Sequence, residues 1–171
     1  MYSDFGYFGS EKAVLVGVIM VATAYLIGNI SPAIILGRKR NIDIKKEQEL
    51  ILKHDNIIFE FPLYWYSSPP ILKKWLDDVL SFNWAYGNEY RLKGKNIGFA
   101  VSVGGPETEY SKTGYVKFSM NEILIPFEAT VEYIKANLIS HYILFDAIES
   151  LSEEKLLEST KNYVKHIFSI K

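Results

Sequence analysis

The stretch Phe61-Pro62-Leu63-Tyr64-Trp65-Tyr66-Ser67-Ser68-Pro69-Pro70 lies between an apolar run and an amphipathic one. The preceding run, Asn56–Phe61, is rich in β-branched and aromatic residues, which predicts a strand that is buried on both faces and ended by Pro62. After the stretch, apolar side chains recur at helical spacing and predict a helix over 70–81. Open α/β sheets bind ligands at the carboxyl ends of their strands, so this aromatic loop is a candidate site.

A second candidate site follows the next predicted strand. Asn96–Val103 is again apolar and β-rich, and it ends in Gly104-Gly105-Pro106. A helix is predicted from Met120 to Ile134, and a third strand over 140–145. Ser152 then fits the N-cap of a last helix. Because strands and helices alternate, we expect an α/β fold with a parallel sheet and right-handed crossovers.

The amino-terminal part of the chain has a different character. Ala13–Gly37 carries no charge, which suits a membrane-spanning helix, and Arg38-Lys39-Arg40 would keep the chain after it on the cytoplasmic face. We therefore expect a tethered segment, 1–42, before a domain, 43–171. The alternative is a buried first strand over 12–21 followed by a helix that Pro32 breaks.

Composition limits the function classes. The chain has 171 residues, a formal net charge of −1 and no cysteine. No basic tract favours a nucleic-acid partner, and without cysteine there is neither a disulfide nor a thiolate metal site. The three histidines, His54, His141 and His166, do not cluster in sequence and are predicted to be surface or core residues rather than catalytic ones.

Residues 55–136 resemble the flavodoxin-like NAD(P)H:quinone oxidoreductases. This group includes the ancillary oxidoreductases of glutathione-gated potassium efflux systems and the mammalian quinone reductases. Beyond the loop 61–66, the resemblance rests on Pro69–Asp77, Phe82–Gly87 and the Gly104-Gly105 pair with Tyr110 and Gly114. It implies a three-layer flavodoxin-like sandwich, bound FMN or FAD, NAD(P)H as the hydride donor and a quinone as the acceptor. The flavin contacts that it implies are Pro62, Leu63, Tyr64, Trp65, Tyr66, Gly104, Gly105 and Tyr110, with Tyr110 as the catalytic hydrogen-bond donor.

The resemblance also implies a homodimer and association with a transporter at the membrane. Three features depart from the family's pattern. Its phosphate-binding loop, of the type His-Pro…Ser-Phe-Asn, is not found before residue 43, so we expect an N-terminally truncated domain with impaired activity. Val116 occupies the position at which mammalian members have a histidine, and Glu60 occupies one at which many members have glutamine.

A second resemblance covers residues 11–46. Ala24–Ala33, Leu36-Gly37-Arg38 and Asn41–Ile44 resemble the start of the membrane glycerol-3-phosphate acyltransferases that use acyl phosphate. The motif that would complete that active site is replaced by Glu47-Gln48-Glu49-Leu50, so we expect an anchor without acyltransferase chemistry. A non-catalytic membrane-tethered module and a chimeric reading frame therefore stay open as alternatives. The rings at 64–66 could equally pack in a dimer interface.

Overall fold

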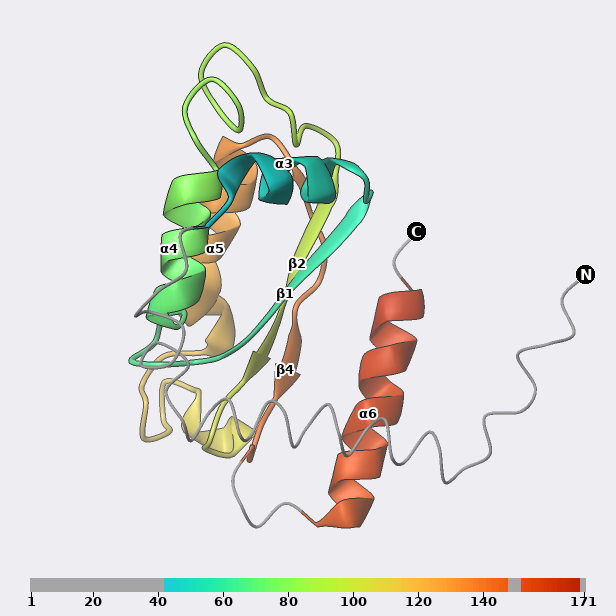
Figure 1. The fold of residues 1–171 in the computed structure, drawn as a ribbon. Coiled ribbons are helices and arrows are strands. Elements are labelled where there is room, and N and C mark those ends of the chain that lie inside the picture. The colour runs from blue at the N-terminus through green and yellow to red at the C-terminus, as the bar shows by residue number, and fades with distance from the viewer. Residues whose placement is uncertain (1–41, 148–151, 170–171) are drawn as a thin grey trace, which may run out of the picture.

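A computed structural model describes residues 42–147 and 152–169, which form a parallel β-sheet with helices on both faces (Figure 1). The strands are β1 (Asn56–Pro62), β2 (Asn96–Ser102), β3 (Asn137–Leu138) and β4 (Tyr142–Leu144). The helices are α3 (Ile44–Leu52), α4 (Pro70–Val79), α5 (Met120–Tyr133), α6 (Glu153–Phe168) and the 3-10 turn η1 (Glu107–Glu109). The predicted alternation of strands and helices is confirmed.

Strand β2 is the centre of the described sheet. It pairs in parallel with β1 along seven residues, from Asn56–Asn96 to Pro62–Ser102, and with β3 and β4 on its other side. The third predicted strand, 140–145, is thus shorter than expected as β4, and β3 lies before it and was not predicted. All strands run the same way, so their carboxyl ends meet at one edge, which is the lower edge in Figure 1.

Three helices cover one face of the sheet and α6 covers the other (Figure 1). Helix α5 begins with a capping box, in which the Ser119 hydroxyl accepts from the Glu122 N–H and the Glu122 carboxylate accepts from the Ser119 N–H. Ser152 is the N-cap of helix α6, as predicted, because its hydroxyl accepts from the Lys155 N–H.

The core lies between β2 and the helices of the first face. Ile97, Phe99 and Val101 of β2 are buried against α5, and they pack with Phe61 and Phe127. The prediction that β1 is buried on both faces is wrong, since Phe61 is its one fully buried residue. Within the described residues β1 has a neighbouring strand on one side only, whereas β2 has strands on both sides.

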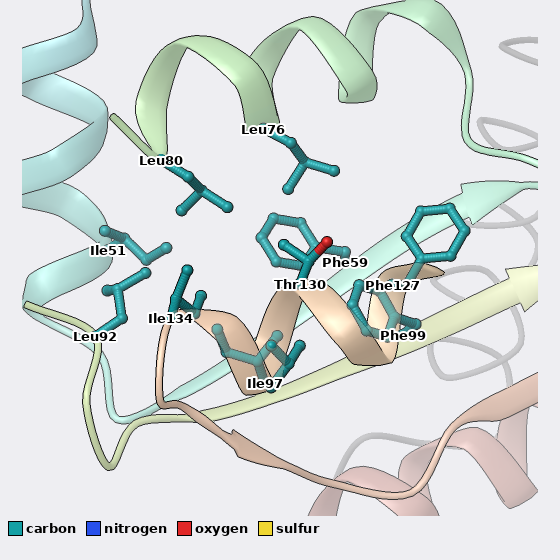
Figure 2. Close-up of a pocket in the computed structure, with 11 residues that line it drawn as sticks. Ile51, Phe59, Leu76, Leu80, Leu92, Ile97, Phe99, Phe127, Thr130 and Ile134 are labelled. Atoms are coloured by element: carbon teal, nitrogen blue, oxygen red, sulfur yellow. The ribbon is translucent and has the colours of Figure 1, made fainter. Parts of the chain in front are cut away.

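Figure 2 shows a small gap within this core, between α3, α4, α5 and the sheet. Its volume is about 10 Å³, and its lining is apolar except for Thr130, whose hydroxyl donates to the Pro126 carbonyl. A gap of this size holds at most about one water molecule, so it is a packing defect and not a ligand site.

The predicted membrane helix 13–37 and the alternative strand 12–21 lie outside the described residues, as does most of the segment that resembles the acyltransferases. Among the residues that are described, no helix has both the length and the apolar character to cross a membrane.

Candidate functional site

The aromatic loop after β1 is a tight turn over Tyr64–Ser67. The Tyr64 N–H donates to the Ser67 carbonyl and the Ser67 N–H donates to the Tyr64 carbonyl, each at 2.9 Å. The Leu63 N–H donates to the Ser102 carbonyl at 2.9 Å, which ties the start of the turn to the end of β2. The turn is therefore fixed at the carboxyl edge of the sheet.

Both central residues of the turn have left-handed backbones, with φ of 48° at Trp65 and 60° at Tyr66. This pair of positive values is typical of a type I′ turn, which asparagine and glycine usually occupy. A non-glycine residue in this conformation costs on the order of 1–2 kcal/mol. Burial of the two side chains offsets little of this backbone cost, since Trp65 is 94% exposed and Tyr66 is 53% exposed. Strain combined with exposed rings indicates a surface that contacts something else.

The glycine pair after β2 faces the same edge. Gly104 is exposed, and Gly105 is held from two sides because its carbonyl accepts from the Asp146 N–H at 3.1 Å while its N–H bonds the Tyr110 hydroxyl. A Cβ added at Gly105 would lie 3.5 Å from the Tyr110 ring, so that ring lies directly against the glycine. The Tyr110 ring also packs against Phe145, with ring centroids 5.7 Å apart.

The surroundings of Tyr110 keep its hydroxyl protonated. Partial burial raises the pKa of Tyr110 above its ordinary value of 10.0, and the nearby Tyr66 and the Glu109 carboxylate raise it further. The Gly105 N–H acts in the opposite direction but does not reverse the shift. Tyr110 is therefore a neutral hydrogen-bond donor over the physiological pH range.

The structure brings the two loops together. The Leu63 N–H donates to the Ser102 carbonyl, and Pro62 pairs with Ser102 at the base of the loops. Among residues 42–147 and 152–169, no protein acceptor takes the N–H groups of Trp65, Tyr66 or Gly104. Exposed rings, unused backbone donors and a protonated hydroxyl at one edge suit a planar ring with polar atoms on its rim.

Two carboxylates, those of Glu60 and Glu109, have different surroundings. Glu60 accepts a hydrogen bond from the Tyr163 hydroxyl of α6, so it is engaged with that helix. Glu109 was not among the predicted site residues, yet its carboxylate oxygen lies only 2.4 Å from where a Gly105 Cβ would be. Neither periodicity nor a motif in the sequence indicates this contact, because it depends on how η1 folds back over Gly105.

The three histidines differ in their surroundings, and the buried Nδ1 of His141 has no hydrogen-bond partner among the described residues. His141 is mostly buried beside Phe99 and contacts the Glu128 carboxylate through Nε2 at 2.9 Å. His54 is exposed and bonds the Leu50 carbonyl, and His166 contacts the Tyr142 ring. None of the three has a contact with the candidate site in the described structure. No group of three potential metal ligands is found among the described residues.

Comparisons with known proteins give a consistent result. A family model described as having a flavodoxin-like fold matches residues 21–167. The uncharacterized NAD(P)H oxidoreductase YdeQ of Bacillus subtilis is 42% identical over 134 residues, which are 78% of this chain and 68% of that protein.

Solved structures agree with this in fold. General stress protein 14 of Treponema denticola, solved in complex with FMN, superposes with a TM-score of 0.75 at 30% identity and covers 94% of this chain and 90% of its own. An NADPH-quinone reductase from P. pentosaceus has a TM-score of 0.64 at 34% identity, covering 72% of this chain and 74% of its own.

Proposed function

This chain belongs to the family of proteins with the flavodoxin-like fold, and from that membership we propose that it is an FMN-dependent NAD(P)H:quinone oxidoreductase. A relative named as an NAD(P)H oxidoreductase supports the nicotinamide donor, and a structural relative named as an NADPH-quinone reductase supports the acceptor. FMN is favoured over FAD because a structural relative was solved with FMN.

The observation that carries the proposal is the meeting of two loops at the carboxyl edge of the sheet. One loop presents exposed rings at Trp65 and Tyr66, and the other presents Gly104, Gly105 and Tyr110. We propose that the flavin ring lies between them, with the backbone N–H groups of Trp65, Tyr66 and Gly104 directed at its polar edge. Pro62, Leu63 and Tyr64 complete the proposed contact by fixing the turn at the end of β1.

Bound FMN supplies the redox chemistry, accepting a hydride from NAD(P)H and passing two electrons to a quinone. The residues of this chain orient the ring and stabilise the charge that it gains. Tyr110 can donate its proton in a hydrogen bond because its raised pKa keeps the hydroxyl neutral. Its oxygen is held by the Gly105 N–H, so the hydroxyl hydrogen is left for the ligand.

The proposal is tested by titrating the purified full chain with FMN and with FAD, following flavin fluorescence and absorbance. We expect FMN uptake, followed by NAD(P)H oxidation that depends on an added quinone. Failure to take up either flavin would overturn the proposed function. It would also fit the sequence-based expectation that the phosphate-binding loop is missing.

A matched pair of aromatic substitutions tests the place of the flavin. Trp65 and Phe82 are both exposed rings, 94% and 64% respectively, but the loop of Phe82 lies at the opposite edge of the sheet (Figure 1). We expect Trp65→Ala to weaken FMN binding about tenfold, the size of one aromatic contact, and Phe82→Ala to leave it unchanged. Equal effects of the two variants would contradict the assignment of the site.

We further propose that the exposed rings of this edge contribute to a homodimer, as the sequence resemblance implies. An interface core is enriched in aromatic residues, and a ring as exposed as Trp65 is suited to one. Light scattering on the wild-type chain and on Trp65→Ala distinguishes this role from flavin binding alone.

Fractionation of the full chain between membranes and supernatant tests the expected transporter association and tether.

A further inference from the structure

The carboxylate of Glu109 shares the surface of Gly105 with the ring of Tyr110. A Cβ built on Gly105 would lie 2.4 Å from Glu109 Oε2 and 3.5 Å from Tyr110 Cε2. Both side chains therefore lie against the same glycine. A negative charge therefore sits at the glycine that the proposed flavin would approach.

The backbone holds Glu109 in this place. Its N–H donates to the Pro106 carbonyl at 3.0 Å, and its carbonyl accepts from the Val116 N–H at 3.0 Å. Gly114 lies so close that an added Cβ would be 2.4 Å from the Glu109 carbonyl oxygen. These contacts use main-chain atoms, so substitution of the Glu109 side chain leaves them available.

The charge of Glu109 is not neutralised by a cation in the described part of the chain. The lysine of the same loop, Lys112, forms an ion pair with Glu122 and lies over the Phe118 ring. Among the described residues, no lysine, arginine or histidine is paired with Glu109. Glu109 is also only partly exposed, so water screens its charge incompletely.

We propose that Glu109 is a positioning residue that makes bound FMN bind less tightly in its reduced form than in its oxidised form, through the repulsion of like charges across Gly105. The inference rests on the proposed function. A flavin ring gains electron density on reduction, and a fixed charge beside it shifts the balance between the two redox forms. The backbone donors and Tyr110 favour the reduced ring, and Glu109 opposes them. The result is a flavin that gives up its electrons to an acceptor more readily.

The test measures FMN affinity in both redox states rather than turnover. Glu109→Gln keeps the shape of the side chain and removes its charge. Anaerobic titration of the full chain with oxidised and with reduced FMN gives the ratio of the two dissociation constants. We expect Glu109→Gln to shift this ratio about tenfold in favour of reduced FMN, as one charge at close range predicts, which raises the two-electron potential by about 30 mV.

Two further variants separate charge from structure. Glu107→Gln removes an exposed carboxylate from the same short turn and is expected to leave the ratio unchanged. Glu109→Asp keeps the charge and is expected to stay close to the wild-type ratio. Circular dichroism confirms that each variant is folded before titration.

The outcomes distinguish the inference from the proposed function. A shift in Glu109→Gln alone supports the role of Glu109. An unchanged ratio in Glu109→Gln, or an equal shift in Glu107→Gln, overturns that role while FMN binding still stands. A wild-type chain that takes up no FMN overturns the proposed function itself, together with the inference that rests on it.

Discussion

The two loops at the carboxyl edge of the sheet are built in opposite ways. The turn Tyr64–Ser67 is closed by its own two main-chain hydrogen bonds, and its central side chains point into solvent. The loop from Gly104 to Ser119 is fixed by a 3-10 turn, by the contacts of Gly105 and Gly114 and by a capping box. The turn Tyr64–Ser67 is short and strained and exposes apolar rings. The loop from Gly104 to Ser119 is longer and holds polar groups in fixed positions.

This difference separates two demands on a ligand site. A surface that stacks on a ligand needs large rings that are exposed to water. Because exposed rings are not stabilised by burial, the turn must hold them through its backbone geometry alone. A directed hydroxyl needs a known protonation state and a fixed orientation, which require neighbours. Tyr110 has such neighbours in Gly105 and Phe145, whereas Trp65 has almost none.

The largest expected effect concerns the packing of the second loop. Gly114→Ala would place a methyl group 2.4 Å from the carbonyl oxygens of Thr108 and Glu109, which are backbone atoms that cannot move independently. We expect a loss of about 2–3 kcal/mol in the free energy of unfolding, measured by urea denaturation. Gly94→Ala is the control, since its Cβ would meet nothing within 4 Å and only its φ of 78° is unfavourable. Equal losses at both glycines would show that close packing does not hold the loop.

The second prediction concerns the strained turn. Trp65→Gly relieves the positive φ but removes the ring, so we expect FMN affinity to fall about tenfold, or 1.4 kcal/mol, without a loss of stability. Lys117→Gly is the control in the other loop, because it also relieves a positive φ, of 67°, at an exposed side chain but removes no ring. Flavin titration and thermal unfolding are measured on both variants. A destabilised Trp65→Gly would contradict the view that the ring is kept for binding.

The third prediction addresses the end of the second loop. Ser119→Ala removes the hydroxyl that caps α5 and leaves the Glu122 N–H without its acceptor. We expect a loss of about 1 kcal/mol in the free energy of unfolding, measured by chemical denaturation. Ser119→Asp should restore most of it, because aspartate also caps helices well. A neutral Ser119→Ala would mean that the cap is not formed in solution.

The smallest effect is a pH dependence. Hydrogen bonds from Lys112 and from Ser119 lower the pKa of Glu122 from 4.5 to about 2. A carboxyl group whose pKa is lower in the folded state stabilises the fold above the unfolded pKa and loses this effect as the pH falls. We therefore expect the melting temperature of wild type to exceed that of Glu122→Gln at pH 6, with the difference shrinking between pH 4.5 and 2. The gap should be small, because the Glu122 side chain is 36% exposed and water screens its charge, and a gap that grows on acidification would contradict the prediction.

Much of the fold could be predicted from local patterns. Strand β1 ends at Pro62 and helix α4 begins at Pro70, as the change from strand to helix period predicted. The N-cap at Ser152 could also be predicted from the sequence, because a serine before two glutamates is a local signal. Strand β3 was not predicted and β4 is shorter than the predicted strand 140–145, since pairing with β2 and not sequence sets where these strands begin and end.

The sequence by itself determined which residues follow each strand and therefore which loops share the carboxyl edge, because parallel strands must end on the same side. It also determined the kind of side chain available there, with rings in one loop and a glycine pair with a tyrosine in the other. The tertiary structure alone decided the left-handed turn at Trp65 and Tyr66, the hydrogen bond that joins Leu63 to Ser102 and the place of Glu109 against Gly105. These three features depend on contacts between residues distant in the chain or on how a loop folds back, and neither periodicity nor composition carries that information.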